Sequence, residues 1–242
     1  MSNFGKIKKM NIVKIENNKW LLEIDLDGGR IVNLVKDNQK ILGTYDRIDG
    51  KIGNTHVCVP NFAAEGVEKF GFVFHGPFRD SQWKVENESE KGIEISCQIE
   101  DLLVKQIFEI NEIFSHKVMV RNMGNERKRV HVAIHNYWDA EFGWQGIKLN
   151  RKDITAGFKN NPEIRLEKNN ILEIPKKKSI IWQVENLKKA KLWTGVKEES
   201  DKRIFDEKYV CIEPEMEYEG FVETGGSWLE HGKEISLIQK IS

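Results

Sequence analysis

The chain consists of short segments in which apolar and polar residues alternate. A period of two, in segments rich in Val, Ile, Phe and Trp, is typical of β-strands that bury one face. No window of about twelve residues keeps the roughly 3.6-residue period of an amphipathic helix. The pattern therefore predicts an all-β protein, with its clearest strands at residues 20–26, 92–100, 102–110, 117–122, 130–138, 180–184, 209–214 and 234–241.

Turn-forming residues separate these segments. Glycine-containing turns of the kind that close antiparallel hairpins are indicated at Asp27-Gly28-Gly29, Asp49-Gly50, Met123-Gly124-Asn125 and Gly225-Gly226. The sequence shows no internal repeat and no Pro/Ser-rich linker, and the lysine-rich residues 151–178 fit charged edge strands and loops. We expect one domain over residues 1–242, folded as a large antiparallel twisted β-sandwich.

The charge of the chain is balanced. The 38 Lys and Arg residues equal the 38 Asp and Glu residues, so the formal net charge is zero. A protein that binds nucleic acid or an anionic membrane usually carries a basic surplus, so we expect neither partner. A neutral small molecule fits this balance at least as well.

Cysteine usage and the N-terminus bear on the cellular compartment. Cys58, Cys97 and Cys211 lie far apart in apolar-rich segments, with no CxxC pair. This pattern fits small buried thiols in a reducing compartment better than disulfides. The N-terminal residues lack an apolar stretch of signal-peptide length, and no segment approaches the roughly 20 apolar residues of a membrane span. We expect a cytoplasmic protein.

Residues 53–80 differ from the predicted strands. Glycines and prolines interrupt regular pairing there, and phenylalanines are interleaved between them. A long aromatic loop on a rigid sheet is a usual place for a binding site. Within this loop Gly76 lets the backbone beside His75 approach a ligand closely, and Arg79 offers a planar fork of donors that suits vicinal hydroxyls or a phosphate.

His131 and His135 lie four residues apart, a spacing that would form a metal pair on a helix. The alternation of residues 130–138 instead indicates a strand, on which residues four apart are ~13 Å from each other and cannot share one metal. With no other cluster at ligand spacing, we expect no metal centre. The alternation places both histidines and Tyr137 on one face, where a histidine is as often a satisfied structural group as a functional one.

Glu213 ends a predicted strand, directly before Pro214, which cannot donate to a strand ladder. By alternation Glu213 shares one face with Tyr209 and Cys211. Partial burial at a strand end can change the basicity of a carboxylate, although an exposed rim glutamate is the simpler interpretation. The glutamates that follow at alternate positions are expected to form a solvated face: Glu215, Glu217 and Glu219.

Two further candidates follow His135 in the sequence. Trp138 has the flat apolar surface that stacks on the C–H face of a sugar ring, although a single tryptophan is more often a core residue. Asp139, with the nearby Glu141, offers a carboxylate that could orient the histidine. No glycine-rich phosphate loop and no Gly-x-Ser-x-Gly nucleophile elbow occurs.

The motifs of this chain, and their order along it, resemble those of the aldose 1-epimerase (galactose mutarotase-like) superfamily, and most closely its hexose-6-phosphate 1-epimerase branch. The resemblance covers nearly the whole chain. Pro77-Phe78 stands where the phosphosugar branch has Phe-Ala, so the substrate, a hexose or a hexose phosphate, stays open. The motifs are Gly28-Gly29-Arg30-Ile31 with Ile41-Leu42, His75-Gly76 with Arg79 and Trp83, His135-Asn136-Tyr137-Trp138, Val210–Pro214, and Gly232-Lys233-Glu234.

The resemblance implies a twisted β-sandwich with a sugar cleft on one sheet, and interconversion of the α and β anomers of an aldose. The ring opens when a proton leaves O1 and another reaches O5. Glu213 as carboxylate would be the base and His135 as imidazolium the acid, without a metal or an organic cofactor. His75 and Arg79 would hold the sugar hydroxyls. From their own chemistry we add two residues to the expected sugar site: Trp138, which could stack on the ring, and Asp139, which lies near the histidine.

Other functions stay open at this point. A non-catalytic carbohydrate-binding or regulatory protein can use the same sandwich, because one fold hosts several functions. A sugar lyase or hydrolase would need a second carboxylate opposite Glu213, for which Asp139 and Glu141 are the nearby candidates. In each case the expected partner is a small-molecule sugar or sugar phosphate, and the chain could assemble as a homodimer.

Overall fold

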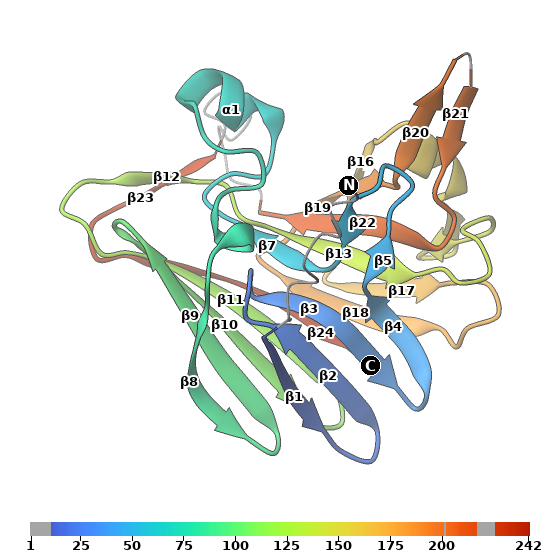
Figure 1. Cartoon of the computed structure of the whole chain (residues 1–242), viewed down its shortest axis with the longest axis horizontal. Coiled ribbons are helices and arrows are strands. Elements are labelled where there is room, and N and C mark those ends of the chain that lie inside the picture. The colour runs from blue at the N-terminus through green and yellow to red at the C-terminus, as the bar shows by residue number, and fades with distance from the viewer. Residues whose placement is uncertain (1–10, 201, 217–225) are drawn as a thin grey trace, which may run out of the picture.

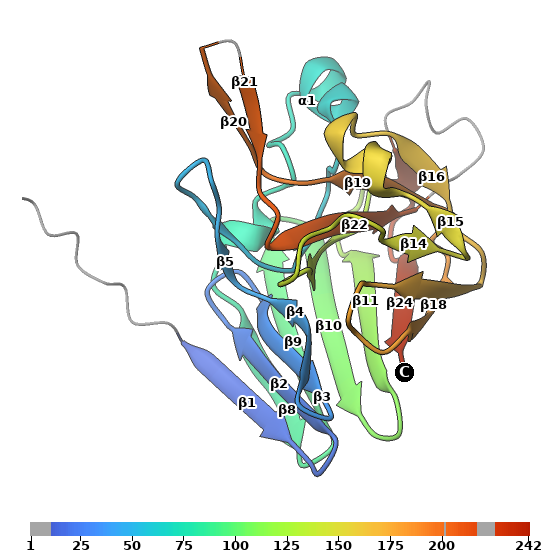
Figure 2. The ribbon, with the colours of Figure 1, turned by 90° about the vertical axis from the view of Figure 1, so that its right-hand side faces the viewer.

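The computed structural model describes residues 11–200, 202–216 and 226–242 of the chain. Most of these residues lie in strands, with one short α-helix, α1 (Ala64–Phe70), and two 3-10 helices, η1 (Phe78–Asp80) and η2 (Thr155–Lys159). The two large sheets lie over each other as a sandwich (Figures 1 and 2). The predicted all-β antiparallel sandwich is confirmed. No helix among the described residues is long and apolar enough to cross a membrane.

The first large sheet carries the candidate site. Its strands are β1 (Ile12–Glu16), β2 (Trp20–Asp25), β3 (Arg30–Lys36), β4 (Gln39–Gly43), β7 (His56–Cys58), β13 (Ala133–Asp139), β16 (Glu163–Arg165), β19 (Lys189–Trp193) and β22 (Tyr209–Glu215). They follow the order β1-β2-β3-β4-β13-β22-β19-β16, and β7 also pairs with β13. Strands distant in sequence therefore become neighbours at the centre of this sheet.

The second large sheet covers the inner face of the first. Its strands are β8 (Lys84–Ser89), β9 (Gly92–Ile99), β10 (Leu102–Ile110), β11 (Phe114–Asn122), β14 (Lys148–Leu149), β15 (Lys152–Asp153), β17 (Asn169–Glu173), β18 (Ile180–Glu185) and β24 (Glu234–Ile241). The order is β15-β14-β17-β18-β24-β11-β10-β9-β8. In β10 and β11 every second residue is buried, which is the alternation that predicted them.

Three two-stranded sheets complete the described strands; the first and the last named below are hairpins, whereas the middle one pairs two strands that are distant in sequence. They are β5 (Tyr45–Asp46) with β6 (Ile52–Gly53), β12 (Lys128–Val130) with β23 (Ser227–Leu229), and β20 (Val196–Glu199) with β21 (Lys202–Phe205). The β20–β21 hairpin and α1 project from the same end of the sandwich in both ribbon views. The β5–β6 hairpin supplies part of the cleft described below.

The two central strands β13 and β22 are buried on both faces. All seven residues of each are buried. Their inner faces contribute Trp138, Val210 and Ile212 to the main apolar core between the sheets. Their outer faces carry a second set, which includes Tyr137 and Cys211. Residues on both faces of these strands are therefore buried, and those on the outer face form the floor of a cleft.

A buried polar network crosses the core behind β13. The His116 ring contacts Gln106 Oε1 at 2.9 Å and Gln239 Nε2 at 3.2 Å. Gln239 also exchanges hydrogen bonds with Asn136, and its Oε1 accepts one from Trp182 Nε1 at 3.2 Å. Since Gln239 donates to one ring nitrogen of His116 and Gln106 Oε1 accepts from the other, the network requires a neutral imidazole. Asn136 thereby fixes the strand that carries His135 on its opposite face.

Candidate active site

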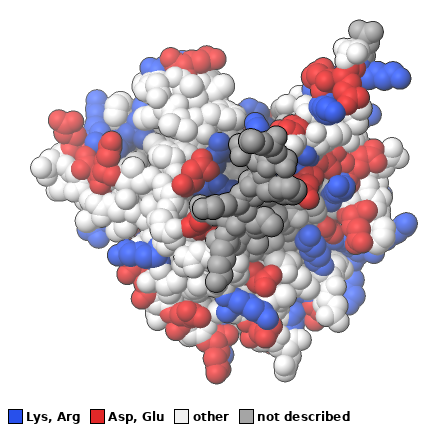
Figure 3. All heavy atoms as spheres, viewed as in Figure 1, with Lys and Arg blue, Asp and Glu red and all other residues white. Residues whose placement is uncertain are grey.

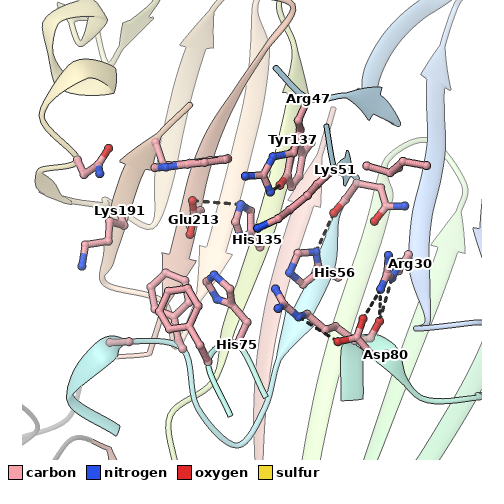
Figure 4. Close-up of a pocket in the computed structure, with 18 of the residues that line it drawn as sticks. Arg30, Arg47, Lys51, His56, His75, Asp80, His135, Tyr137, Lys191 and Glu213 are labelled. Atoms are coloured by element: carbon pink, nitrogen blue, oxygen red, sulfur yellow. Dashed lines mark hydrogen bonds and ion pairs between the residues drawn. The ribbon is translucent and has the colours of Figure 1, made fainter. Parts of the chain in front are cut away.

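A cleft of about 660 Å³ lies over the outer face of the first sheet. Its floor is formed by β7, β13, β22 and β19, and its walls by the β5–β6 hairpin and the aromatic loop around α1 and η1. The lining residues are Arg30, Arg47, Lys51, Ile52, Asn54, His56, Phe62, Ala63, Ala64, Phe74, His75, Arg79, Asp80, His135, Tyr137, Asn161, Lys191, Trp193 and Glu213. Figure 4 shows most of their side chains.

His135 and Glu213 meet on the cleft floor. The antiparallel pairing of β13 with β22 sets Asn136 opposite Ile212. His135, which precedes Asn136, and Glu213, which follows Ile212, therefore lie side by side. Glu213 Oε1 lies 3.2 Å from His135 Nε2 (Figure 4). Both side chains are about 95 % buried, with exposed fractions of 4 % and 6 %. The structure therefore brings together the two residues that the sequence nominated for proton transfer.

The contact between the two side chains leaves His135 open to a ligand. Although Glu213 Oε1 is close, it does not lie in line with a ring N–H. Neither ring nitrogen of His135 has a hydrogen-bond partner among the described residues. A buried polar atom without a partner is costly unless a ligand or water completes it. The geometry therefore suits an imidazole that binds a polar group in the cleft.

Burial favours the uncharged form of both groups. Burial, and next the charge of Glu215, raises the pKa of Glu213 to about 8. Burial, and next the neighbouring His56 and His75, lowers the pKa of His135 well below its usual 6.5. In the free protein at neutral pH, burial thus favours a proton on Glu213 and a neutral His135, whereas the sequence analysis expected a carboxylate beside an imidazolium.

His56 is a site residue that the sequence analysis missed. It pairs directly with His135 across the β7–β13 ladder, and the ring centroids are 4.8 Å apart. Its Nδ1 lies 2.8 Å from the Asn54 carbonyl oxygen, which makes Nδ1 the donor and leaves Nε2 as an acceptor. Among the described residues Nε2 has no hydrogen-bond partner. The signal was present only in the tertiary pairing, because His56 lies in a short strand with no alternation to read.

His75 lies where the resemblance implied, at the cleft wall. Its ring is 5.2 Å from that of His135, and its Nδ1 contacts Cys58 Sγ at 3.3 Å. Both His75 (φ 63°) and Gly76 (φ 72°) have left-handed backbone conformations. A Cβ at residue 76 would lie 1.7 Å from the Val59 carbonyl oxygen, so only glycine allows this close approach. The His-Gly motif therefore has a steric basis: the glycine positions the histidine.

Aromatic rings form a second wall of the cleft. Tyr137 stacks on His135 at 4.9 Å, and Trp193 approaches the same ring edge-on at 5.8 Å. The Arg47 guanidinium lies 4.6 Å above the Trp193 ring and pairs with Asp49 at 2.6 Å. These contacts hold Arg47 over the cleft. The sequence pattern did not indicate this residue.

Arg79 lies at the far end of the cleft, on η1, together with Arg30. The Arg30 guanidinium donates two hydrogen bonds to the Arg79 carbonyl oxygen, at 2.9 and 2.6 Å. Asp80 lies 2.6 Å from Arg30 Nη2 and 3.5 Å from Arg79 Nε. Arg79 therefore lines the cleft as the sequence suggested, and its contact with a substrate stays a prediction.

Trp138 and Asp139 do not line the cleft, and the structure corrects both assignments. Trp138 is fully buried in the core between the sheets, where its ring packs against Trp182 at 5.3 Å. Alternation itself places Trp138 on the face opposite His135. Asp139 lies on the outer face, but it accepts a hydrogen bond from Tyr45 Oη at 2.5 Å and pairs with the buried Lys177. Both residues have structural contacts in place of sugar contacts.

Glu215 is also buried, contrary to the solvated face expected for it. Its Oε2 lies 2.7 Å from His131 Nε2, and its Oε1 lies 3.7 Å from Lys189 Nζ. The other two glutamates of that expected face, Glu217 and Glu219, lie outside the described residues. His131 therefore has a carboxylate partner of its own and is not among the residues that line the cleft.

Two groups of side chains at the cleft floor have the spacing of metal ligands. They are His56, Cys58 and His135, and His135, Cys211 and Glu213, with the ligand atoms of each group within 4.8 Å of one another. Spacing along the sequence could not reveal them, because each group draws on two separate strands. Burial raises the pKa of both thiols well above the usual value. Both groups use His135, so a bound metal would occupy an imidazole that proton transfer needs.

Comparison with known proteins identifies the fold. No protein-family model and no curated protein sequence matches the chain. Solved structures do match: the Slr1438 protein of Synechocystis sp. PCC 6803 has a TM-score of 0.73 at 15 % identity and covers 100 % of this chain and 99 % of its own. A galactose mutarotase related enzyme from Lactobacillus acidophilus has a TM-score of 0.72 at 16 % identity, with 96 % of each chain covered.

A galactose mutarotase-like protein from Lactobacillus casei gives the same result. Its TM-score is 0.71 at 13 % identity, and the match covers 96 % of this chain and 99 % of the other. At such low identity, the similarity shows that the backbones have the same fold. It does not show that the proteins catalyse the same reaction. The chain has the fold of the galactose mutarotase-like and aldose 1-epimerase proteins.

Proposed function

We propose that the protein is an aldose 1-epimerase-like isomerase that interconverts the α and β anomers of a hexose or hexose phosphate. The observation that carries this proposal is the 3.2 Å approach of Glu213 Oε1 to His135 Nε2 on the floor of the cleft. O1 and O5 of an aldose ring are bonded to the same carbon. Two groups that exchange protons with these atoms must both reach the same anomeric centre, which a pair as close as this can do.

The reaction needs one proton on the pair. With that proton on His135, Glu213 accepts the O1 proton while His135 protonates O5, and the ring opens. The aldehyde rotates about the C1–C2 bond, and the reverse transfers close the ring on its other face. With the proton on Glu213, the two residues exchange roles and the same atoms move. Burial favours this second arrangement in the free protein.

The remaining cleft residues suit binding and orientation. His75 and Tyr137 present polar atoms on either side of His135. Burial, and next Arg79, lowers the pKa of His75 to about 3, so His75 is a neutral hydrogen-bonding group and not a second acid at neutral pH. Trp193 offers an apolar ring of the kind that packs on sugar C–H groups. These contacts would position the anomeric carbon over the pair.

The charge of the cleft favours a substrate with an anionic group. Lys and Arg are interspersed with Asp and Glu on the face shown in Figure 3, in keeping with the zero net charge of the chain. The cleft is different, because five basic side chains, Arg30, Arg47, Lys51, Arg79 and Lys191, line it against only Asp80 and Glu213 among the described residues. We therefore favour a hexose phosphate over a neutral hexose.

The rival functions differ in what the cleft must contain. A hydrolase needs a second carboxylate across the ring from Glu213; the only other carboxylate among the described lining residues is Asp80, which two arginines hold. A carbohydrate-binding protein needs the cleft but not the pair. The close approach of His135 and Glu213 in a cleft therefore favours the isomerase over both alternatives.

The test of this function is anomer exchange. Freshly dissolved α-D-glucose, α-D-galactose and glucose 6-phosphate are followed by polarimetry with and without the protein, and the spontaneous rate is subtracted. We expect faster exchange for at least one of them. Saturable binding without acceleration of any sugar would instead identify a binding protein. A panel with neither acceleration nor binding would contradict a sugar-directed function.

A further inference from the structure

The five basic residues of the cleft differ in how far their charges are already used. Arg30 and Arg79 share Asp80, and Arg30 also donates to a backbone carbonyl. Arg47 is paired with Asp49 and lies against Trp193. Among the described residues, the two lysines, Lys51 and Lys191, form no ion pair. The free positive charge of the cleft therefore belongs to these two side chains.

Lys191 is the better placed of the two lysines. It lies on β19 directly opposite Glu213 in the β19–β22 ladder, so both side chains extend from the same face of the sheet. It is half-buried, whereas Lys51 is exposed on the β5–β6 hairpin. Figure 4 shows Lys191 beside Glu213 at one end of the cleft, with Arg30 and Asp80 at the other. A half-buried ammonium on a strand that is paired on both sides is less screened by water and better fixed than one on an exposed hairpin.

The charge of Lys191 acts on Glu213: burial raises the pKa of that carboxyl and Lys191 lowers it by less, but the two side chains form no ion pair. No carboxylate among residues 11–200, 202–216 and 226–242 pairs with Lys191 Nζ, although Glu213 extends from the facing strand. A partly buried ammonium without an ion-pair partner is available to the opposite charge of a ligand. The cleft in which Lys191 lies is open to such a ligand.

We propose that Lys191 is the anion-binding residue of the cleft, and that it takes a phosphate or carboxylate group carried by the aldose beside its free anomeric centre. This inference rests on the proposed function for the identity of the ligand as a sugar. The anionic group cannot be on O1, because a substituted O1 has no proton to give up and its ring cannot open. The substrate class is therefore an aldose with a free anomeric hydroxyl and an anionic group elsewhere, a sugar phosphate or a uronic acid.

The test compares three sugars that share one ring: D-glucose, D-glucose 6-phosphate and D-glucuronate. Anomer exchange is measured by NMR for the wild type and for Lys191→Met, Lys191→Arg and Lys148→Met, the last at an exposed lysine on β14 of the other sheet. Loss of one charge-assisted hydrogen bond lowers the affinity for the ligand about ten- to hundredfold. We expect Lys191→Met to raise KM for the preferred anionic sugar by that factor and to leave kcat and the exchange of D-glucose within about threefold.

The two control variants separate binding from folding. Lys191→Arg keeps the charge and should retain most of the preference for the anionic sugar. Lys148→Met removes the same charge at an exposed position outside the cleft and should change KM by less than about threefold. Equal losses for neutral and anionic sugars in Lys191→Met would overturn the proposal, and so would a wild type that exchanges D-glucose as efficiently as both anionic sugars.

Calorimetric titration with glucose 6-phosphate and glucuronate distinguishes failure of this inference from failure of the proposed function. If the wild type binds an anionic sugar without accelerating its exchange, and Lys191→Met weakens that binding about ten- to hundredfold, the anion-binding role stands while the isomerase does not. If neutral aldoses are exchanged and neither anionic sugar binds more tightly than D-glucose, the isomerase stands and the role of Lys191 is refuted.

Discussion

Glu213 and His135 extend from neighbouring antiparallel strands into one cleft, where Glu213 Oε1 and His135 Nε2 are 3.2 Å apart. Burial disfavours the charged form of each side chain, and the proposed ring opening requires the pair to hold one proton. The shared proton makes their protonation states, and therefore the pH dependence of the reaction, a direct consequence of the fold.

The pH profile of kcat/KM should reflect the two shifted groups. The active pair holds one proton, so activity falls where Glu213 loses its proton, above about pH 8. It also falls where His135 gains a second proton, well below pH 6.5. We expect a plateau across neutral pH, measured after subtraction of the spontaneous rate. A fall in kcat/KM that begins as pH rises above 6.5 would contradict this. It would indicate an imidazolium with its usual pKa beside an ionised carboxylate.

Replacement of Gly76 should disturb the cleft through the backbone. Its φ is 72°, and an added Cβ would lie only 1.7 Å from the Val59 carbonyl oxygen, so no side chain fits there without movement of the loop. Gly50 has a similar φ of 79°, but a Cβ there meets nothing within 4 Å. We expect Gly50→Ala to lower the free energy of unfolding by about 1–2 kcal/mol, and Gly76→Ala to lower it further.

Thermal and urea unfolding measure both glycine variants. The adjacent His75 should also lose its place in the cleft in Gly76→Ala, which would reduce sugar binding, while Gly50→Ala should bind as the wild type does. Equal stability of the two variants would show that the approach to Val59 is not a constraint.

The contacts of Asp139 predict a stability effect instead of a binding effect. Asp139 and Lys177 have side chains that are each 5 % exposed, and Tyr45 Oη donates to the same carboxylate. Asp139→Ala leaves a buried ammonium without its partner, which should cost about 3–5 kcal/mol. Asp139→Asn keeps an acceptor for Tyr45 and should cost less. A rise in KM for the sugar without loss of stability would instead restore the sequence-based role in substrate binding.

His116 should make the fold sensitive to acid. Burial lowers its pKa to about 3, so its contribution to stability is complete above the unfolded pKa of about 6.5 and is lost as pH falls from there toward 3. Protonation would place a donor against Gln239 Nε2, which already donates to the ring. We expect the free energy of unfolding to decrease between about pH 6.5 and 4. His116→Gln should flatten this decrease; an unchanged slope would assign the acid sensitivity to other groups.

The sequence pattern predicted the strands and the faces of the site because both follow from a period of two. Alternation placed Glu213 with Tyr209 and Cys211, and the structure has all three on the outer face. The same rule places Trp138 on the inner face, opposite His135, and a strict application would have assigned it to the core. Its assignment to the sugar site came from the stacking chemistry of a tryptophan ring, not from the periodicity.

Other features depend on which strands become neighbours. His56 faces His135, and Lys191 faces Glu213, only because β7 and β19 lie beside the two central strands. Lys177 reaches Asp139 from a part of the chain 38 residues away. Pairings of this kind bring together segments without a common local pattern, so the sequence did not indicate these partners.

The most direct test of the account is the exchange rate between the two anomers, measured by saturation-transfer NMR for the wild type, Glu213→Gln and His135→Asn. Glu185→Gln, an exposed carboxylate on the other sheet, serves as the matched control. We predict acceleration by the wild type and the control, and an about 10²- to 10⁴-fold loss in each site variant while the fold is retained. Acceleration that survives in both folded site variants would contradict the shared-proton mechanism.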